Sequence, residues 1–169
     1  MTPPLRIDTS ICTFRRAALT ETLASLSRLI IPAGVRLGII VADNDVEPSA
    51  RTRVEAAMPM LPTDILYVHC PAGNISIARN ACLDHSDADF IAFVDDDETV
   101  EPLWLDALLA AAEKSRADVV LGPVRALYGP GAPDWMRSGD FHATRPVWVN
   151  GEICTGYTCN VLMRLPAPS

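Results

Sequence analysis

FIAFVDDDET (residues 90–99) joins five mostly apolar residues directly to four acids. The apolar residues at 90–94 are typical of a buried strand. The acids at 95–98 gather negative charge at the end of that strand, where their mutual repulsion raises the energy. One explanation is that positive charge belongs at this strand end.

Strand patterns alternate with helical patterns on both sides of this stretch. The expected strands are 5–12, 36–42, 64–70, 90–94 and 118–127, and the expected helices are 15–30, 47–58, 74–85 and 101–115. We expect Thr13 and Asn74 to cap the first and third helices, and Pro102 to lie in the first turn of the fourth. This order predicts an α/β fold with a Rossmann-like, mostly parallel sheet and helices on both faces.

The pattern changes after residue 127. Residues 1–127 form the expected α/β core, and residues 128–169 form a loop-rich extension of the same single domain. The extension contains GPGAPDWMRSGDF (129–141), which we expect to be a loop, and a late strand at 155–165.

Composition limits the classes of partner. The 169 residues are 49% apolar and carry 14 basic against 21 acidic residues, a net charge of −7. This balance argues against nucleic acid and anionic membrane surfaces, which favour clustered Lys and Arg. The sequence lacks the apolar run of a signal peptide or a membrane span. Five cysteines without a CxxC pair indicate reduced thiols, so we expect a cytoplasmic protein.

Polar residues gather where the expected strands end. In doubly wound sheets, ligands bind beyond the carboxyl ends of the strands. Four such ends are CTFRR (12–16), ADND (42–45), CPAGN (70–74) and VDDDE (94–98). These segments are therefore expected to surround one binding site.

The acids after the fourth strand suit a metal ion. In an extended chain, Asp95 and Asp97 point to one face with α-carbons roughly 7 Å apart. Carboxylates at this spacing suit Mg²⁺ or Mn²⁺, which would also attract an anionic nucleotide. The alternative is a solvated acidic turn that caps the next helix.

Single residues at the other strand ends also have two interpretations. Asp43 either accepts a hydrogen bond from a base or is a turn acid. Phe14 either stacks on a base or belongs to the core. Arg79 either meets a base or phosphate or forms a surface ion pair.

Taken together, these segments resemble the family 2 glycosyltransferases of the GT-A fold. The resemblance is strongest to bacterial exopolysaccharide enzymes of the succinoglycan glucosyltransferase type. The matching segments are ICTFRR (11–16), IIVADND (39–45), GNISIARNACLD (73–84), FIAFVDDDE (90–98), LGPVRALYGPGAPDWM (121–136) and TGYTCNVLMR (155–164). They cover nearly the whole chain in the expected order.

The resemblance implies a donor, an acceptor and a set of site residues. The donor is a nucleotide-diphosphate sugar with uridine as the expected base, the acceptor is a saccharide or lipid-linked, and transfer inverts the anomeric carbon with Mn²⁺ or Mg²⁺. The resemblance is also compatible with peripheral attachment at the inner membrane face. The implied contacts are Thr13, Phe14 and Asp43 to the base, Arg79 to the base or phosphates, Asp96 or Asp95 to the ribose, and Asp97 to the metal.

The resemblance also implies that the catalytic general base is missing from these 169 residues. It locates the general base in an acidic pair beyond the late strand, and therefore beyond Ser169, so we expect a C-terminally truncated form whose catalytic residue is unknown. Trp135 is the candidate on the acceptor side, because an aromatic ring stacks on the apolar face of a sugar. Its alternative is to anchor the loop to the core.

Three other functions are alternatives to this interpretation. A nucleotide-sugar-binding protein without transferase activity remains the principal alternative. A receiver-type phosphoacceptor needs an acidic pair after the first strand and a lysine after the fifth, where this chain has Cys12-Thr13 and Val124-Arg125. Nucleotidyltransferases open with a glycine-rich loop, and CTFRRA (12–17) has no glycine.

Overall fold

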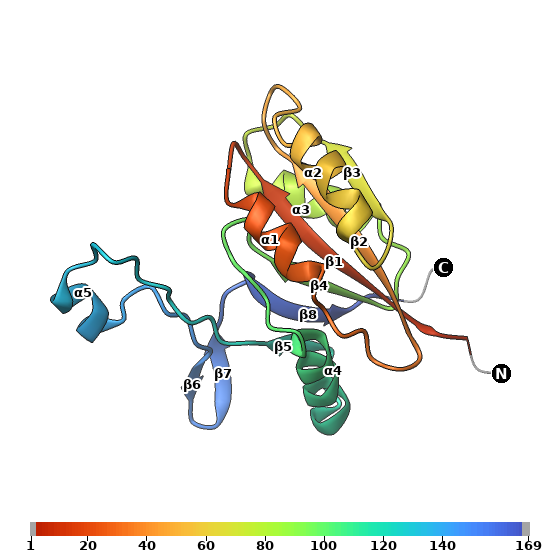
Figure 1. Cartoon of the computed structure of the whole chain (residues 1–169). Helices are drawn as coiled ribbons and strands as arrows, with labels where there is room; N and C mark the ends of the chain where they lie inside the picture. Colours follow the sequence, from red (N-terminus) through yellow and green to blue (C-terminus); the bar gives the residue numbers. More distant parts are fainter. Residues whose placement is uncertain (1–2, 167–169) are drawn as a thin grey trace.

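The central strand of the sheet, β1, is also the first in the chain, and its neighbours follow a Rossmann-like pattern (Figure 1). The computed structural model describes residues 3–166. The six-stranded sheet has the order β3-β2-β1-β4-β8-β5. Its strands are β1 (Leu5–Thr13), β2 (Val35–Asp43), β3 (Ile65–His69), β4 (Phe90–Val94), β5 (Val119–Leu121) and β8 (Asn160–Arg164). The pairs among β1 to β4 are all parallel, which confirms the predicted mostly parallel sheet.

Helices cover both faces of this sheet (Figure 1). They are α1 (Leu19–Leu26), α2 (Arg51–Ala57), α3 (Ile75–Asp84) and α4 (Trp104–Ser115), with a short 3₁₀ turn at Met58–Met60 after α2. The buried strand β4 alternates between the two faces. Phe90, Ala92 and Val94 pack in the cluster that contains α1, α2 and α4, whereas Ile91 and Phe93 pack in the cluster that contains α3.

The late strand lies inside the core sheet. β8 is antiparallel to both β4 and β5 and separates them. Asn160 pairs with Val94, and its side-chain oxygen accepts a hydrogen bond of 2.9 Å from the indole of Trp104. Residues 160–164, which were expected in the extension, therefore complete the core.

Several predicted boundaries were wrong. Thr13 ends β1 and does not cap α1, whose N-cap is Ala18. The strand expected at 118–127 is only the short β5, because Gly122 and Pro123 follow it and proline has no backbone N–H for a ladder. α4 begins two residues after Pro102.

One predicted cap was correct. The side chain of Asn74 accepts a hydrogen bond of 2.9 Å from the backbone N–H of Ser76, and so caps α3 as predicted.

The part of the extension before β8 is more regular than expected, and its helix and hairpin lie apart from the six-stranded sheet (Figure 1). It contains α5 (Asp134–Gly139) and a hairpin of β6 (Val147–Val149) and β7 (Glu152–Thr155). The loop prediction for 129–141 was therefore wrong in part, since Trp135 lies in α5 and Pro133 precedes it. Asn150 and Gly151 form the hairpin turn with φ of 52° and 83°, the left-handed values that such turns require.

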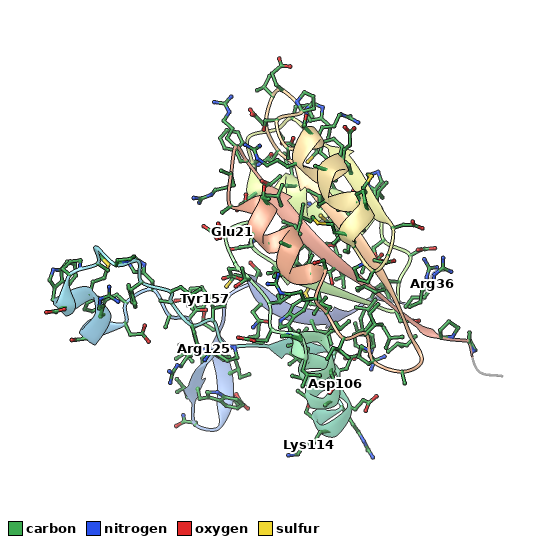
Figure 2. The ribbon with its side chains drawn as sticks, viewed as in Figure 1. Glu21, Arg36, Asp106, Lys114, Arg125 and Tyr157 are labelled. Carbon is green, nitrogen blue, oxygen red and sulfur yellow. The ribbon has the colours of Figure 1, made fainter. Side chains whose placement is uncertain are left out.

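Charged side chains mark the outer faces of the helices. Glu21 on α1, and Asp106 and Lys114 on α4, are exposed, opposite the buried leucines of the same helices (Figure 2). All five cysteines are free. None of the helices within residues 3–166 has the length and apolar character needed to cross a membrane.

The position of β8 makes a prediction about stability. Leu162 is 1% exposed in β8, so Leu162→Ala should lower the free energy of unfolding by about 2–5 kcal/mol through lost burial and a cavity. Leu127, which is 87% exposed, is the matched control, and Leu127→Ala should change it by less than about 0.5 kcal/mol. Chemical denaturation measures both. A loss below about 1 kcal/mol for Leu162→Ala would contradict a place for β8 in the core.

Candidate functional site

A hollow of about 510 Å³ lies at the carboxyl ends of β1, β2 and β4. Its lining residues are Cys12, Thr13, Phe14, Arg15, Arg16, Asn44, Ile75, Arg79, Asp95, Asp96 and Asp97. They come from the first, second and fourth strand ends and from α3. The volume is in the range of small-molecule sites.

The acids of the hollow are held by the neighbouring strand end. Asp96 is 8% exposed and accepts a buried hydrogen bond of 2.7 Å from the Thr13 hydroxyl. This bond ties the loop after β4 to the end of β1, the parallel neighbour of β4. Thr13 and Asp96 therefore form one unit at the floor of the site.

Arginines supply the positive charge that the acids require. Arg16 lies 3.7 Å from a carboxylate oxygen of Asp96 and 3.5 Å from one of Asp97. Arg79 lies 3.5 Å from a carboxylate oxygen of Asp95. The hollow thus contains carboxylates and guanidinium groups side by side, and can offer charge of either sign to a ligand.

Burial raises the pKa of Asp95, Asp96 and Glu98 on this loop. It is the main cause for both Asp95 and Asp96, with Arg79 opposing it at Asp95 and the Thr13 hydroxyl opposing it at Asp96. Burial, together with the nearby charge of Asp95, raises the pKa of Glu98 to about 7. Negative charge on this loop is therefore costly unless a partner balances it.

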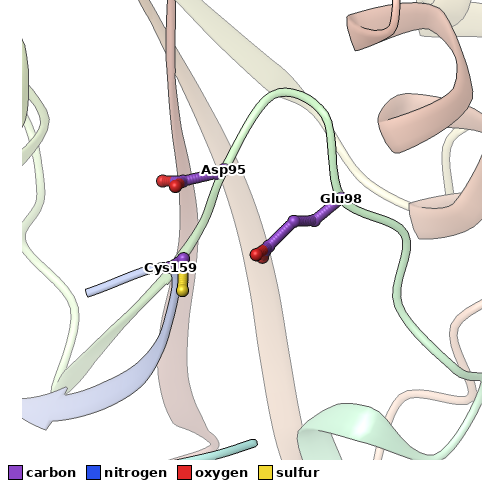
Figure 3. A group of neighbouring side chains, drawn as sticks. All are labelled: Asp95, Glu98 and Cys159. Carbon is purple, nitrogen blue, oxygen red and sulfur yellow. The ribbon is translucent and has the colours of Figure 1, made fainter. Parts of the chain in front are cut away.

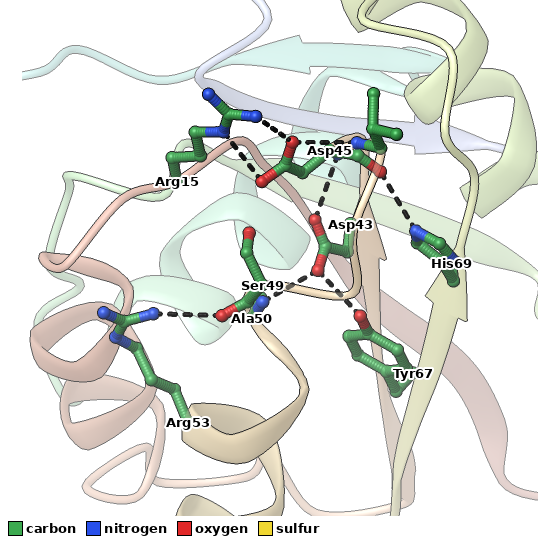
Figure 4. Close-up of polar contacts among 9 residues, drawn as sticks. Arg15, Asp43, Asp45, Ser49, Ala50, Arg53, Tyr67 and His69 are labelled. Atoms are coloured by element: carbon green, nitrogen blue, oxygen red, sulfur yellow. Dashed lines mark hydrogen bonds and ion pairs between the residues drawn. The ribbon is translucent and has the colours of Figure 1, made fainter.

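The loop after β1 is fixed by an ion pair to the loop after β2 (Figure 4). Arg15 donates two hydrogen bonds, of 2.8 and 2.9 Å, to the carboxylate of Asp45, which is 2% exposed. Arg15 has a φ of 55°, an uncommon conformation for a residue with a side chain. The bidentate pair holds the loop in this conformation, with its neighbours Phe14 and Arg16 at the hollow.

Asp43 serves the fold around the hollow and does not line it. Its side chain is fully buried. Its two oxygens accept hydrogen bonds from the backbone N–H of Asp45 at 3.1 Å, that of Ala50 at 2.8 Å and the hydroxyl of Tyr67 at 2.7 Å. We predicted that Asp43 contacts the base, but protein donors already occupy both oxygens of its carboxylate.

The next residue, Asn44, lines the hollow in place of Asp43. Its backbone N–H donates to the Thr13 carbonyl at 2.9 Å, and its side-chain oxygen accepts from the backbone N–H of Asn74 at 3.0 Å. Gly73, with a φ of 57°, donates to the Asn44 carbonyl at 3.2 Å. Asn44 thus joins three of the four predicted strand-end segments.

The structure brings together most of the residues predicted for the site. Thr13, Phe14, Arg79, Asp95, Asp96 and Asp97 all line the hollow, whereas Asp43 and Trp135 do not. Trp135 is 64% exposed on α5, with its ring centroid 6.2 Å from that of Phe141. This exposure does not favour its alternative role as a core anchor.

Sequence reasoning missed five further contributors. Cys12, Arg15, Arg16, Asn44 and Ile75 line the hollow but were not predicted. Four of them lie within the strand-end segments CTFRR and ADND, so the signal was the segment and not the individual residue. Ile75 begins α3, immediately after its cap.

Comparison with known proteins gives one family. The family model described as "Glycosyl transferase family 2" matches residues 10–167. The succinoglycan biosynthesis protein ExoM of Rhizobium meliloti (strain 1021) is 62% identical over 165 residues, which are 98% of this chain and 53% of that protein. The chain therefore spans about half the length of this curated relative.

Solved structures share the fold. Staphylococcus aureus TarS 1-349 superposes with a TM-score of 0.70 at 21% identity, over 95% of this chain and 47% of that chain. The mannosyltransferase PcManGT from Pyrobaculum calidifontis, in complex with GDP-Man and Mn²⁺, gives a TM-score of 0.52 at 25% identity. The match covers 75% of this chain and 36% of that chain. The predicted GT-A fold is confirmed.

The Arg15–Asp45 pair predicts a pH dependence. The guanidinium of Arg15 is the main cause that lowers the pKa of Asp45 from its ordinary 3.8 to about 2. A lowered pKa in the folded state means that the pair stabilises the fold above about pH 4 and loses this effect as the pH falls from about 4 to 2. Arg15→Gln should therefore be less stable than the unmodified protein at pH 7, by a margin that narrows below about pH 4.

Urea unfolding between pH 7 and pH 3 measures this margin. Arg53→Gln is the matched control, because Arg53 is exposed and donates to the carbonyl of Ser49 and not to an acid. Its margin should stay constant over the same range. A margin for Arg15→Gln that is also constant would rule out the ion pair as its cause.

Proposed function

The chain belongs to glycosyl transferase family 2, and we propose that it forms the donor-binding part of a glycosyltransferase. The proposed reaction moves a sugar, with inversion, from a nucleotide-diphosphate sugar, with uridine as the base, to a saccharide or lipid-linked acceptor. The observation that carries the proposal is the hollow of about 510 Å³, in which arginines and aspartates face one another. A diphosphate needs the positive charge of the arginines, and a divalent cation needs the carboxylates of the aspartates. The similarity to ExoM supports a role in exopolysaccharide assembly.

The nucleoside would occupy the side of the hollow formed by the first two strand ends. Phe14 lines the hollow and is 46% exposed, so its ring is available to stack on a base. Asn44 offers an amide for the edge of the base. Asp43 is assigned a positioning role, because its hydrogen bonds hold the turn that carries Asn44.

The ribose and the diphosphate would lie over the acid loop. Asp96, oriented by Thr13, is the proposed acceptor for ribose hydroxyls, with Asp95 beside it. Arg79 and Arg16 are the proposed phosphate contacts, since guanidinium groups match phosphate oxygens in charge and geometry.

A divalent metal fits the donors present. Asp97 is 47% exposed at its side chain and offers hard carboxylate oxygens, which suit Mn²⁺ or Mg²⁺. When bound, such an ion would neutralise negative charge on the leaving diphosphate. The complex of PcManGT with GDP-Man and Mn²⁺ supports this proposal.

The acceptor side needs a proton acceptor. In an inverting transfer, a carboxylate removes the proton of the acceptor hydroxyl as that hydroxyl attacks the anomeric carbon. The three aspartates of the hollow are each engaged by arginine or threonine, and we do not assign this role to them. Trp135, exposed on α5, remains the proposed contact for an acceptor sugar ring.

Metal-dependent binding of the diphosphate is the first test. Asp97→Asn removes the proposed metal ligand, so it should weaken UDP binding in Mn²⁺ by about tenfold or more, and chelation by EDTA should weaken binding to the unmodified protein similarly. Asp106→Asn, an exposed acid on α4, should bind as the unmodified protein does. Calorimetry gives these affinities. Equal UDP affinity for Asp97→Asn and the unmodified protein in Mn²⁺ would refute the role of Asp97.

Base stacking by Phe14 is the second test. Phe14→Ala should weaken the binding free energy of UDP by about 1–3 kcal/mol, the usual range for base–aromatic stacking, and leave pyrophosphate binding unchanged. Phe141→Ala is the matched control, because Phe141 is 70% exposed and lies outside the hollow. An equal loss for UDP and pyrophosphate would assign Phe14 to the shape of the loop and not to the base.

A further inference from the structure

A second group of ligand-type atoms lies beside the hollow. Asp95, Glu98 and Cys159 each offer one such atom, and these three atoms lie within 4.8 Å of one another. Figure 3 shows the two carboxylates and the thiol as neighbours, which come from the loop after β4 and from the residue before β8. Of the three residues, only Asp95 lines the hollow.

The thiol is an independent contributor to this group. Cys159 is 8% exposed, so more than nine-tenths of it is buried, and it belongs to a segment remote in sequence from the acids. Its Sγ lies 3.9 Å from the hydroxyl of Thr144, within the range of a hydrogen bond to sulfur. The buried thiol also lies beside the two carboxylates.

The backbone holds the three groups in place. Asn160, adjacent to Cys159, pairs with Val94 in the sheet, and its side chain is bonded to the Trp104 indole at 2.9 Å and the Pro123 carbonyl at 3.0 Å. The backbone N–H of Glu98 donates to the Asp95 carbonyl at 3.2 Å, which closes a turn between the two acids. Both sides of the group are thus anchored to the core.

These donors suit a different metal from Mn²⁺ or Mg²⁺. Carboxylate oxygens with a cysteine sulfur are ligands of Zn²⁺, whereas Mg²⁺ prefers oxygen alone. Tetrahedral Zn²⁺ with bonds of about 2.0–2.3 Å has ligand atoms roughly 3.5 Å apart. The three atoms lie within 4.8 Å of one another, so binding would draw them about 1 Å closer together.

We propose that Asp95, Glu98 and Cys159 form a binding site for a thiophilic divalent cation, Zn²⁺ or its analogue Cd²⁺, separate from the oxygen-only metal proposed at Asp97. Three protein ligands leave one position for water. Because Asp95 also lines the hollow and lies beside Arg79, the cation would share one side chain with the donor pocket.

Titration of the untagged protein with Cd²⁺ and Zn²⁺ in excess Mg²⁺ tests the proposal. Cd²⁺ bound to a thiolate gives an ultraviolet charge-transfer band, which reports the sulfur ligand directly, and calorimetry gives the Zn²⁺ stoichiometry. The unmodified protein should bind one equivalent and show the band. Cys159→Ser should lose the band and weaken Zn²⁺ by about tenfold or more.

Matched variants keep the test independent of folding. Cys154→Ser changes an exposed cysteine and should keep both the band and the affinity. Glu98→Gln should weaken Zn²⁺ by about tenfold or more even if Cys159→Ser fails to fold, whereas Glu101→Gln, which alters an exposed acid paired with Arg125, should not. A band retained in Cys159→Ser, or unchanged Zn²⁺ affinity in Glu98→Gln, would overturn the proposal.

Discussion

The buried carboxylate of Asp43 constrains the whole carboxyl edge of the sheet. A fully buried charge is costly unless several donors surround it, and here they come from the turn after β2, the start of α2 and the hydroxyl of Tyr67 on β3. Meeting this requirement fixes the chain path between β2 and α2. Asn44 and Asp45, which follow directly, are therefore presented at defined positions, one to the hollow and the other to Arg15.

The acid loop after β4 then divides its charge among several partners. Asp96 and Asp97 lie near Arg16, Asp95 lies near Arg79, and Glu98 lies on the other side with Cys159. In the proposed donor complex, the diphosphate would take over the arginines while the metal takes over Asp97, so that ions exchange partners within one site. This exchange would leave the charge of the site similar before and after binding.

The sequence predicted much of the candidate site, because the carboxyl ends of parallel strands meet at one edge. That rule brought Thr13, Phe14 and the acids 95–97 together correctly. It could not distinguish Asp43 from Asn44, since successive side chains in a strand point to opposite faces and only the packing of Tyr67 and α2 decides which face is buried. The ion pairs of Arg15 and Arg16 depend on loop conformation, which local pattern does not specify.

The same division applies to the fold. Apolar periodicity determined the α/β class and the alternation of strands and helices, and the residue type at the helix start determined the cap at Asn74, because each depends on neighbours in sequence. Tertiary structure decided that β8 enters between β4 and β5, and that a thiol from residue 159 meets acids from residues 95 and 98. These contacts join segments far apart in the chain, so the free energy that selects them comes from packing and hydrogen bonding that only the assembled sheet provides.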